Sequence, residues 1–299
     1  ICFCTRRADV YQFAVCHFKT GKIMTQIIVQ GPQLTRELAG EIAEKLSGQC
    51  QWQDSYALIE NTQHADLSML RQQYAVDINV LPADFETNDC RLIVMDMDST
   101  LITIECIDEI ADFMDLKPQV AAITEAAMRG EIDFETSLKQ RVALLEGLPV
   151  DMLDRVYNER LMLNSGAELM LKTVQQAGIK TALVSGGFTF FTDKLKKRLN
   201  LEFTQANVLE HENGYLTGNV TGEICGAQAK ADFLIKCCAE LNIEKQQAVA
   251  IGDGANDLLM MAEAGMSVAY HAKPKVQEAA DTALNHCGLD GVLGLLQRP

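Results

Sequence analysis

Short apolar runs and amphipathic stretches alternate over the first 86 residues. One apolar run ends before Gly31 and Pro32, and a leucine or isoleucine then recurs at every fourth position from Leu34 to Leu46. Apolar residues four apart lie on one face of a helix. The pattern predicts strand 22–32, helix 34–48, strand 51–60, helix 65–76 and strand 77–82. Residues 1–86 are therefore expected to form a small α+β domain, and the polar stretch 83–90 is expected to be a linker.

The pattern changes after the linker. An apolar strand at 91–95 is followed by about sixty residues that read as helices, and from Gly166 strands and helices alternate again. The elements predicted there are helix 167–178, strand 179–187, helix 191–199, a hairpin turning at Asn213 and Gly214, helix 227–241, strand 246–254, a last helix ending at Gly265 and strand 266–270. Such alternation is typical of parallel sheets. Residues 87–299 are expected to form a doubly wound, Rossmann-like α/β core, with a helical cap at about 106–165 inserted after its first strand.

Three of the predicted strands end in unusual sequences. These are "DMDST" at 96–100, "SGG" at 185–187 and "GDGAND" at 252–257. Because parallel strands place their carboxyl ends at one edge of the sheet, where ligands bind, the three sequences are expected to meet at one site.

Asp96 and Asp98 lie two residues apart, so in an extended chain they face the same side, about 6.6 Å apart. A calcium-binding loop does not fit, because Leu101 stands where that loop needs glycine and Ile107 where it needs glutamate. A dinucleotide-binding GxGxxG loop does not fit either, because Asp257 replaces the last glycine.

Four carboxylates at this edge require a cation. Asp96, Asp98, Asp253 and Asp257 would repel one another by about 4 kcal/mol per pair at 4 Å and an effective dielectric constant near 20. A few hard oxygen ligands that leave room for water and a phosphate suit Mg²⁺. The "SGG" hydroxyl and backbone N–H groups can hold an anion, and Lys230 is the candidate for a nearby positive charge. The edge is therefore expected to perform phosphoryl transfer.

Composition narrows the choice of partners. The chain has 26 Lys and Arg against 41 Asp and Glu, a formal charge of −15. This charge disfavours nucleic acid and anionic membranes, so a small phosphorylated molecule is the expected partner. The ten cysteines are scattered without metal-site spacing and are expected to be reduced core thiols. No apolar run of 18 residues and no signal-peptide pattern occur, which predicts a cytoplasmic protein.

One cap helix carries a charge on its apolar face. At about 100° per residue, Leu138, Arg141 and Leu145 all fall within about 40° of Phe134. A guanidinium in such a stripe needs an anion, and a substrate carboxylate would supply one. A snorkelling side chain or a structural ion pair remains the alternative for Arg141, as does a solvated carboxylate for Glu105.

The motifs "DMDSTL", "SGG", Lys230 and "GDGANDLLM", in this order, resemble the haloacid-dehalogenase superfamily of phosphatases, and the cap resembles its phosphoserine phosphatase family. The resemblance covers about residues 90–285. It implies that Asp96 is the nucleophile and that Asp98 is the general acid and base. It further implies that Ser185 and Lys230 hold the phosphoryl oxygens, with the Gly186 N–H adding a hydrogen bond.

The resemblance also implies a metal site and a substrate. Mg²⁺ would be bound by Asp96, the backbone carbonyl of Asp98 and Asp253, with Asn256 and Asp257 orienting the surroundings. Leu259 departs from the family pattern, which has proline there, and this departure affects only the local start of a helix.

The implied substrate is O-phosphoserine, converted to serine and phosphate in the last step of serine biosynthesis. Glu105 would bind its ammonium group and Arg141 its carboxylate, while Met128 and Phe134 would close the pocket, although both could be ordinary core residues. Another small phosphomonoester is the alternative substrate. The N-terminal domain resembles small regulatory (ACT-like) domains and could bind an amino acid or serve only for dimerisation, so a homodimer is compatible with the sequence.

Overall fold

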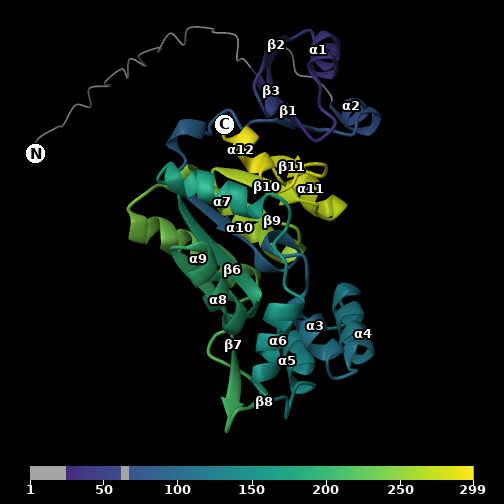
Figure 1. Cartoon of the computed structure of the whole chain (residues 1–299), viewed down its shortest axis with the longest axis vertical. Helices are drawn as coiled ribbons and strands as arrows, with labels where there is room; N and C mark the ends of the chain where they lie inside the picture. The colour runs from purple at the N-terminus through teal and green to yellow at the C-terminus, as the bar shows by residue number, and fades with distance from the viewer. Residues whose placement is uncertain (1–24, 62–66, 299) are drawn as a thin grey trace, which may run out of the picture.

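The computed structural model describes residues 25–61 and 67–298, which form a small N-terminal unit above a larger core unit (Figure 1). Residues 22–24 of the predicted strand 22–32 and residues 65 and 66 of the predicted helix 65–76 lie outside the described residues. The elements of the N-terminal unit are β1 (Thr25–Gln30), α1 (Arg36–Lys45), β2 (Gln49–Trp52), β3 (Tyr56–Asn61), α2 (Ser68–Gln73) and β4 (Asp77–Val80). The four strands form an antiparallel sheet in the order β2-β3-β1-β4.

Both faces of strand β1 are buried. Ile27 and Val29 pack with Ile42 of α1 in one cluster, whereas Ile28, between them, belongs to the core of the larger unit. Since side chains alternate across a strand, β1 faces its own helices with one set of residues and the core unit with the other. This double burial explains why the run at 27–29 is continuously apolar.

The predicted strand 51–60 is wrong as a single element. It divides into the end of β2 and most of β3, which pair as a hairpin from Trp52 opposite Ala57. The Gln53 N–H donates to the Tyr56 carbonyl and closes the turn. The linker also differs from expectation, because Phe85 and Cys90 within it are buried.

The core unit is built on a seven-stranded sheet in the order β11-β10-β9-β5-β6-β7-β8. Its strands are β5 (Leu92–Met95), β6 (Lys180–Phe188), β7 (Phe203–Glu212), β8 (Tyr215–Thr221), β9 (Ala248–Gly252), β10 (Met266–Tyr270) and β11 (Thr282–Leu284). All neighbours are parallel except β7 and β8. The first strand, β5, lies between β6 and β9, so the strand order reverses beside it and opens a ligand crevice at its carboxyl end.

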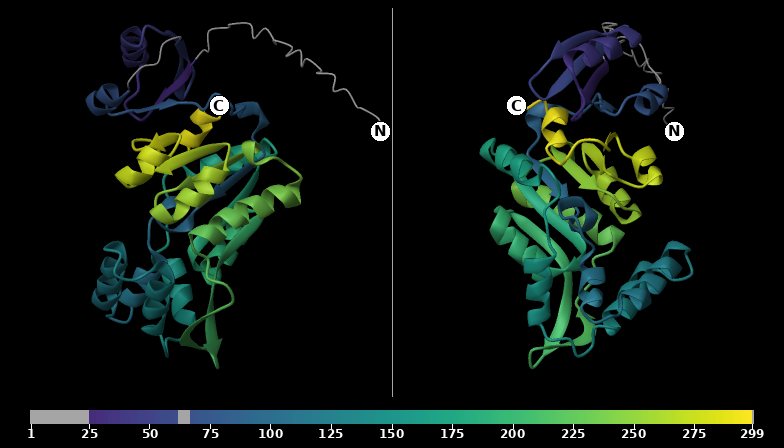
Figure 2. Two further views of the ribbon diagram at one scale, coloured as in Figure 1. Left: turned by 180° about the vertical axis from the view of Figure 1, so that it is seen from behind. Right: turned by 45° about the vertical axis from the view of Figure 1, so that its right-hand side comes forward.

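Helices cover both faces of the sheet, as the predicted doubly wound fold requires (Figures 1 and 2). They are α7 (Ala167–Gln176), α8 (Thr189–Leu199), α9 (Ala227–Leu241), α10 (Leu258–Glu263), α11 (Pro274–Ala279) and α12 (Gly291–Leu295), with 3-10 turns η1 (Thr87–Asp89), η3 (Lys245–Gln247) and η4 (Ala255–Asp257). Ile93 and Met95 pack on one face with Phe191 of α8, and Leu92 and Val94 on the other face with Leu234 of α9.

Four helices form the cap after β5, in agreement with the sequence pattern. They are α3 (Cys106–Asp112), α4 (Lys117–Met128), α5 (Phe134–Ala143) and α6 (Asp151–Glu159). The β7–β8 hairpin reaches this cap, because the Gly147 N–H donates to Leu216 O at 2.9 Å and the Val150 N–H to Gly214 O at 2.9 Å. The hairpin turn is as predicted, with positive φ at Asn213 and Gly214. The core sheet thus supports the cap directly.

The C-terminal segment contains elements that the sequence pattern did not predict. Helices α11 and α12 and the three-residue strand β11 follow the helix that was expected to be the last. The cysteines of the described ranges are free thiols; most are buried as predicted, but Cys50 is exposed. None of the helices in the described ranges has the length and apolar character needed to span a bilayer.

Candidate active site

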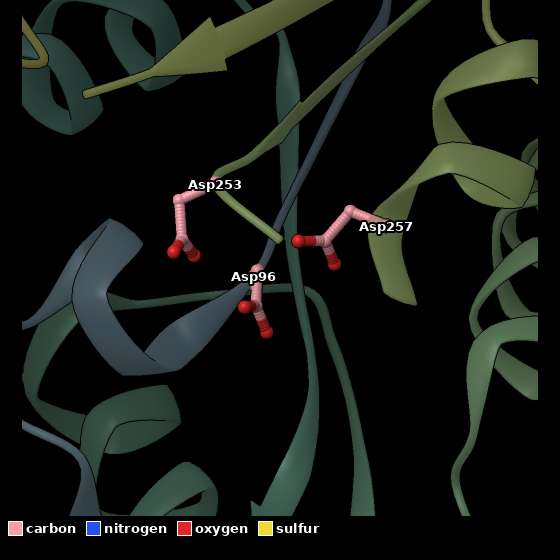
Figure 3. A group of neighbouring side chains, drawn as sticks. All are labelled: Asp96, Asp253 and Asp257. Atoms are coloured by element: carbon pink, nitrogen blue, oxygen red, sulfur yellow. The ribbon is translucent and has the colours of Figure 1, made fainter. Parts of the chain in front are cut away.

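Three carboxylates meet at the carboxyl edge of the core sheet (Figure 3). Asp96 follows β5, Asp253 follows β9 and Asp257 ends the turn η4. One carboxylate oxygen from each lies within 4.8 Å of the others, a spacing that could hold a metal ion. The prediction that these strand ends converge is confirmed in space.

Lys230, in the first turn of α9, balances two of these charges. Its ammonium group is fully buried and donates to Asp96 Oδ1 and to Asp257 Oδ1, both at 2.7 Å. Asp257 Oδ2 accepts the Gly254 N–H at 3.0 Å, so both oxygens of Asp257 are engaged by the protein. In the part of the chain that the structure describes, Asp96 Oδ2 has no hydrogen-bond partner. This oxygen is therefore available to a ligand.

Burial and mutual repulsion shape the protonation of the edge. Burial, and next the charge of Asp257, raises the pKa of Asp96 well above its usual range, while Lys230 opposes the shift. Burial and the charge of Asp257 also raise the pKa of Asp253. Desolvation lowers the pKa of Lys230, but the two aspartates outweigh it, so that pKa is raised and the ammonium stays charged. Such an edge needs further positive charge to keep all its carboxylates ionised.

Asp98 reaches the site by a different route from the one predicted. Strand β5 does not continue through Asp98, because the π-turn η2 (Met97–Leu101) begins directly after Asp96 and is closed by the Ile102 N–H, which donates to the Met97 carbonyl at 3.0 Å. The Asp98 carboxylate instead accepts the Cys106 N–H at 2.8 Å and the Ser185 hydroxyl at 3.1 Å. Asp98 therefore belongs to a turn and not to an extended segment, but its side chain and that of Asp96 line the same cavity. Burial raises the pKa of Asp98, which favours its protonated form.

The "SGG" segment holds its polar groups firmly. Ser185 is fully buried, and its hydroxyl accepts the Gly187 N–H at 2.7 Å while donating to Asp98. The Gly186 carbonyl accepts the Asn207 side-chain amide at 2.7 Å, which fixes that peptide plane. A Cβ at Gly187 would lie 2.8 Å from Asp98 Oδ2. Glycine is needed there for the close approach of the two segments.

The cap and the core enclose a cavity of about 500 Å³. Arg141 lines it and is half-buried; its Nε donates to the Ser137 carbonyl at 3.3 Å. Among the described residues, no carboxylate lies within ion-pair distance of its guanidinium. Burial lowers the pKa of Arg141, and the more distant charges of Asp108 and Glu105 partly offset this. The structural ion pair considered from the sequence is therefore absent, and the remaining N–H donors are available to an anion in the cavity.

Glu105 lies on the same cavity at the start of α3. Its Oε1 accepts the Ser99 hydroxyl at 2.7 Å. The side chain is exposed to the cavity. The surrounding protein partly desolvates its carboxylate, and this desolvation, together with the smaller effect of the charge of Asp98, raises the pKa of Glu105 to about 7. Glu105 and Arg141 thus present one acid and one base to the same space.

A sequence model of the haloacid dehalogenase-like hydrolases matches residues 90–265. The chain is also 53% identical over 225 residues to the phosphoserine phosphatase of Polaromonas sp. strain JS666, covering 74% of this chain and 95% of that protein. This chain belongs to the phosphoserine phosphatase family of haloacid dehalogenase-like hydrolases.

Solved structures of related hydrolases agree over nearly the whole chain. A hydrolase of the haloacid dehalogenase family from Salmonella enterica serovar Typhi superposes with a TM-score of 0.84 at 32% identity, covering 92% of this chain and 99% of that one. A probable phosphoserine phosphatase from Vibrio cholerae, without ligand, gives a TM-score of 0.79 at 39% identity, covering 91% and 86%. The similarity therefore extends beyond the hydrolase core to the N-terminal unit.

Phe134 and Met128, both predicted to close the pocket of this hydrolase, differ in their packing. Phe134 is half-buried against the "SGG" segment, where a Cβ on Gly186 would lie 3.0 Å from its ring. Met128 lines the cavity but is 69% exposed, so the packing predicted for it is absent. Asn256 also lines the cavity. Leu259, the departure from the family pattern, is exposed in the first turn of α10 and leaves that helix intact.

Sequence reasoning missed several polar groups of this hydrolase site. Thr100 donates to Asp253 Oδ1 at 3.1 Å, and Asp108 and Lys273 line the cavity. Thr100 was recognisable as the end of "DMDST", and Lys273 follows strand β10 just as Asp253 follows β9. Asn207, which holds the Gly186 carbonyl, carries no comparable signal.

Proposed function

We propose that this chain hydrolyses O-phosphoserine to serine and phosphate. The observation that carries the proposal is the half-buried Arg141, which has no ion-pair partner among the described residues and shares a cavity with Glu105 and Asp96. Arg141 can bind the carboxylate of an amino acid and Glu105 its ammonium group. The aspartate edge, with a bound cation, can bind the phosphate of the same molecule. A phosphorylated sugar has neither an ammonium group nor a carboxylate, so Glu105 and Arg141 would be left without partners on it.

In the first step, Asp96 Oδ2 attacks phosphorus. Lys230 binds the other oxygen of Asp96 and favours the ionised carboxylate. The new O–P bond forms as the bond to the serine oxygen breaks, and Asp98 gives its proton to that oxygen. The raised pKa of Asp98 supports this role, because burial favours the protonated form that a general acid needs. The products are an aspartyl phosphate and free serine.

In the second step, Asp98 takes a proton from water, and the water oxygen attacks phosphorus. The O–P bond to Asp96 breaks, which releases phosphate and restores the carboxylate. The Ser185 hydroxyl and the Gly186 N–H bind the phosphoryl oxygens in both steps, and Lys230 lies beside them. Since Ser185 now donates to Asp98, it has to turn toward the phosphoryl group when substrate binds.

The donor set fits Mg²⁺. Carboxylate oxygens of Asp96, Asp253 and Asp257 lie within 4.8 Å of one another, and hard oxygen ligands are those that Mg²⁺ prefers. We assign Asp96, Asp253 and the Asp98 backbone carbonyl as ligands. Asp257 is better suited to orienting Lys230 and Gly254, because both of its oxygens are engaged. When bound, Mg²⁺ supplies positive charge that neutralises the edge and polarises the phosphoryl group.

We also propose that the chain consists of two domains, residues 1–86 and 87–299, and that the cap spans about residues 106–165 of the second domain. The separate apolar cluster of the small sheet and its helices supports the division. A role of the first domain in binding an amino acid or in forming a homodimer would be tested by deleting it and measuring serine inhibition and molecular mass.

Phosphate release from O-phosphoserine, with and without EDTA, tests the function. Asp96→Asn should abolish turnover. Arg141→Ala should raise KM for O-phosphoserine and spare hydrolysis of p-nitrophenyl phosphate, which has no carboxylate. Arg155→Ala is the matched control, because this cap arginine is half-exposed and pairs with Glu159 on the surface. Equal losses on both substrates in Arg141→Ala would exclude the carboxylate clamp.

A further inference from the structure

A buried aspartate joins the N-terminal unit to the core unit. Asp77, on β4, is 3% exposed, and its carboxylate accepts three consecutive backbone N–H groups that follow β11. The donors are Asn285 at 2.7 Å, His286 at 3.2 Å and Cys287 at 2.9 Å. Successive N–H groups that converge in this way form an anion-binding nest. The nest is filled here by a side chain of the other unit.

Asn79, two residues along β4, makes a second link. Its side-chain amide donates to Ala283 O at 2.9 Å and accepts the Ala283 N–H at 2.8 Å. Ala283 lies on β11, the edge strand of the core sheet. The Asn79 amide thus satisfies an edge that would otherwise lack a neighbouring strand. The views agree that the C-terminal elements lie directly against the N-terminal unit (Figures 1 and 2).

Hydrogen bonds continue from this junction to the active site. The Asn285 side chain donates to Gln277 Oε1 at 3.0 Å, and Gln277 Nε2 donates to Ala272 O at 2.6 Å. The next residue, Lys273, lines the cavity, and its N–H donates to Asp253 O at 3.4 Å. We call the connection from Asp77 through Asn285 and Gln277 to Lys273 the relay.

Lys273 is well placed to attract a phosphate. Most charged residues lining the cavity are acidic, and the chain as a whole carries a formal charge of −15. Lys273 and Arg141 are the two basic residues that line it in the part of the chain that the structure describes. The aspartates at the sheet edge repel an incoming phosphate unless a positive charge offsets theirs. The position of the Lys273 ammonium group therefore affects how readily the substrate binds.

We propose that Asp77 is a positioning residue for phosphoserine hydrolysis, holding Lys273 at the cavity through the relay. The inference rests on the proposed function. It assigns the N-terminal unit a role in substrate capture, although none of the residues 25–61 and 67–86 that the structure describes there lines the cavity. A purely structural Asp77 would hold the two units together without affecting Lys273.

Asp77→Asn in the full chain weakens the nest with little change in shape, because it removes the charge and replaces one of the two acceptor oxygens by an N–H donor that faces the backbone N–H groups. We expect kcat/KM for O-phosphoserine to fall about fivefold, at the low end of coupling between distant sites, mainly through KM. Gln277→Leu interrupts the relay within the core unit and should do the same even if Asp77→Asn fails to fold. Gln297→Ala is the matched control, because it removes a hydrogen bond across the same junction, to Gln26 Oε1 at 2.9 Å, outside the relay. It should leave the kinetics unchanged.

Two further measurements separate positioning from docking. Lys273→Ala should also lower kcat/KM, and adding Asp77→Asn or Gln277→Leu to it should cause no further loss. Amide hydrogen exchange at residues 271–277 should speed up in Asp77→Asn and Gln277→Leu but not in Gln297→Ala. Losses that add in full, or unchanged exchange and kinetics in both relay variants, would overturn the proposal. If the parent did not hydrolyse O-phosphoserine, the proposed function would fail, while exchange would still decide whether Asp77 positions Lys273.

Discussion

Replacement of Lys230 by methionine tests how the catalytic edge is held together. Methionine resembles the lysine stem but has no charge, so Asp96 and Asp257 would each lose a partner at 2.7 Å in a fully buried site. Removing one partner of a buried ion pair typically costs about 3–5 kcal/mol. We expect a loss of about this size in the free energy of unfolding at pH 8, together with loss of turnover.

The loss should depend on pH in a defined direction. Burial and the charge of Asp257 already raise the pKa of Asp96, and removing Lys230 raises it further. The folded variant then keeps protons at pH values where an unfolded aspartate, with a pKa of about 3.9, is ionised. Stability falls with rising pH wherever the folded state binds more protons. The deficit relative to the parent should therefore be small near pH 4 and complete above the raised pKa.

Urea unfolding followed by circular dichroism in EDTA, at several pH values from 4 to 8, measures this deficit. Lys236→Met is the control, because Lys236 lies on the same helix with its side chain 70% exposed and should change stability by less than about 0.5 kcal/mol. A deficit below about 1 kcal/mol at pH 8, or one that is constant with pH, would refute the account of the edge as two buried carboxylates neutralised by Lys230.

Three further outcomes are expected. Because the pKa of Glu105 is raised to about 7, the dissociation constant of O-phosphoserine, measured calorimetrically in metal-depleted conditions, should rise as pH falls through that value, and Glu105→Gln should remove this dependence beyond the titration of the substrate itself. Gly187→Ala should lower kcat at least tenfold, since its Cβ would lie 2.8 Å from Asp98 Oδ2, whereas Gly40→Ala, with open space around it, should not. Asp133→Ala removes the N-cap of α5 and should cost about 1 kcal/mol in thermal or urea unfolding, with an unchanged stability contradicting the capping role.

Local pattern determined most of the core fold. The strands at β5, β6 and β9 and the four cap helices were predictable because their apolar residues repeat at the period of one element and stop at glycine or polar residues. The errors occurred where an element depends on distant partners. Strand β11 has three residues and pairs with β10 on one side and with the Asn79 amide on the other. No local pattern reveals such partners.

The sequence by itself determined the chemistry of the site: which residue types end the strands, and that Asp96, Ser185 and Asp253 must serve one edge, since parallel strands share a direction. The tertiary structure decided how each group is used. It placed Asp98 in the turn after β5, where its carboxylate accepts the Ser185 hydroxyl, and it left Arg141 facing a cavity without an ion-pair partner among the described residues. Spacing along a chain can bring residue types to one edge, but hydrogen bonds and ion pairs depend on directions that only the packed elements define.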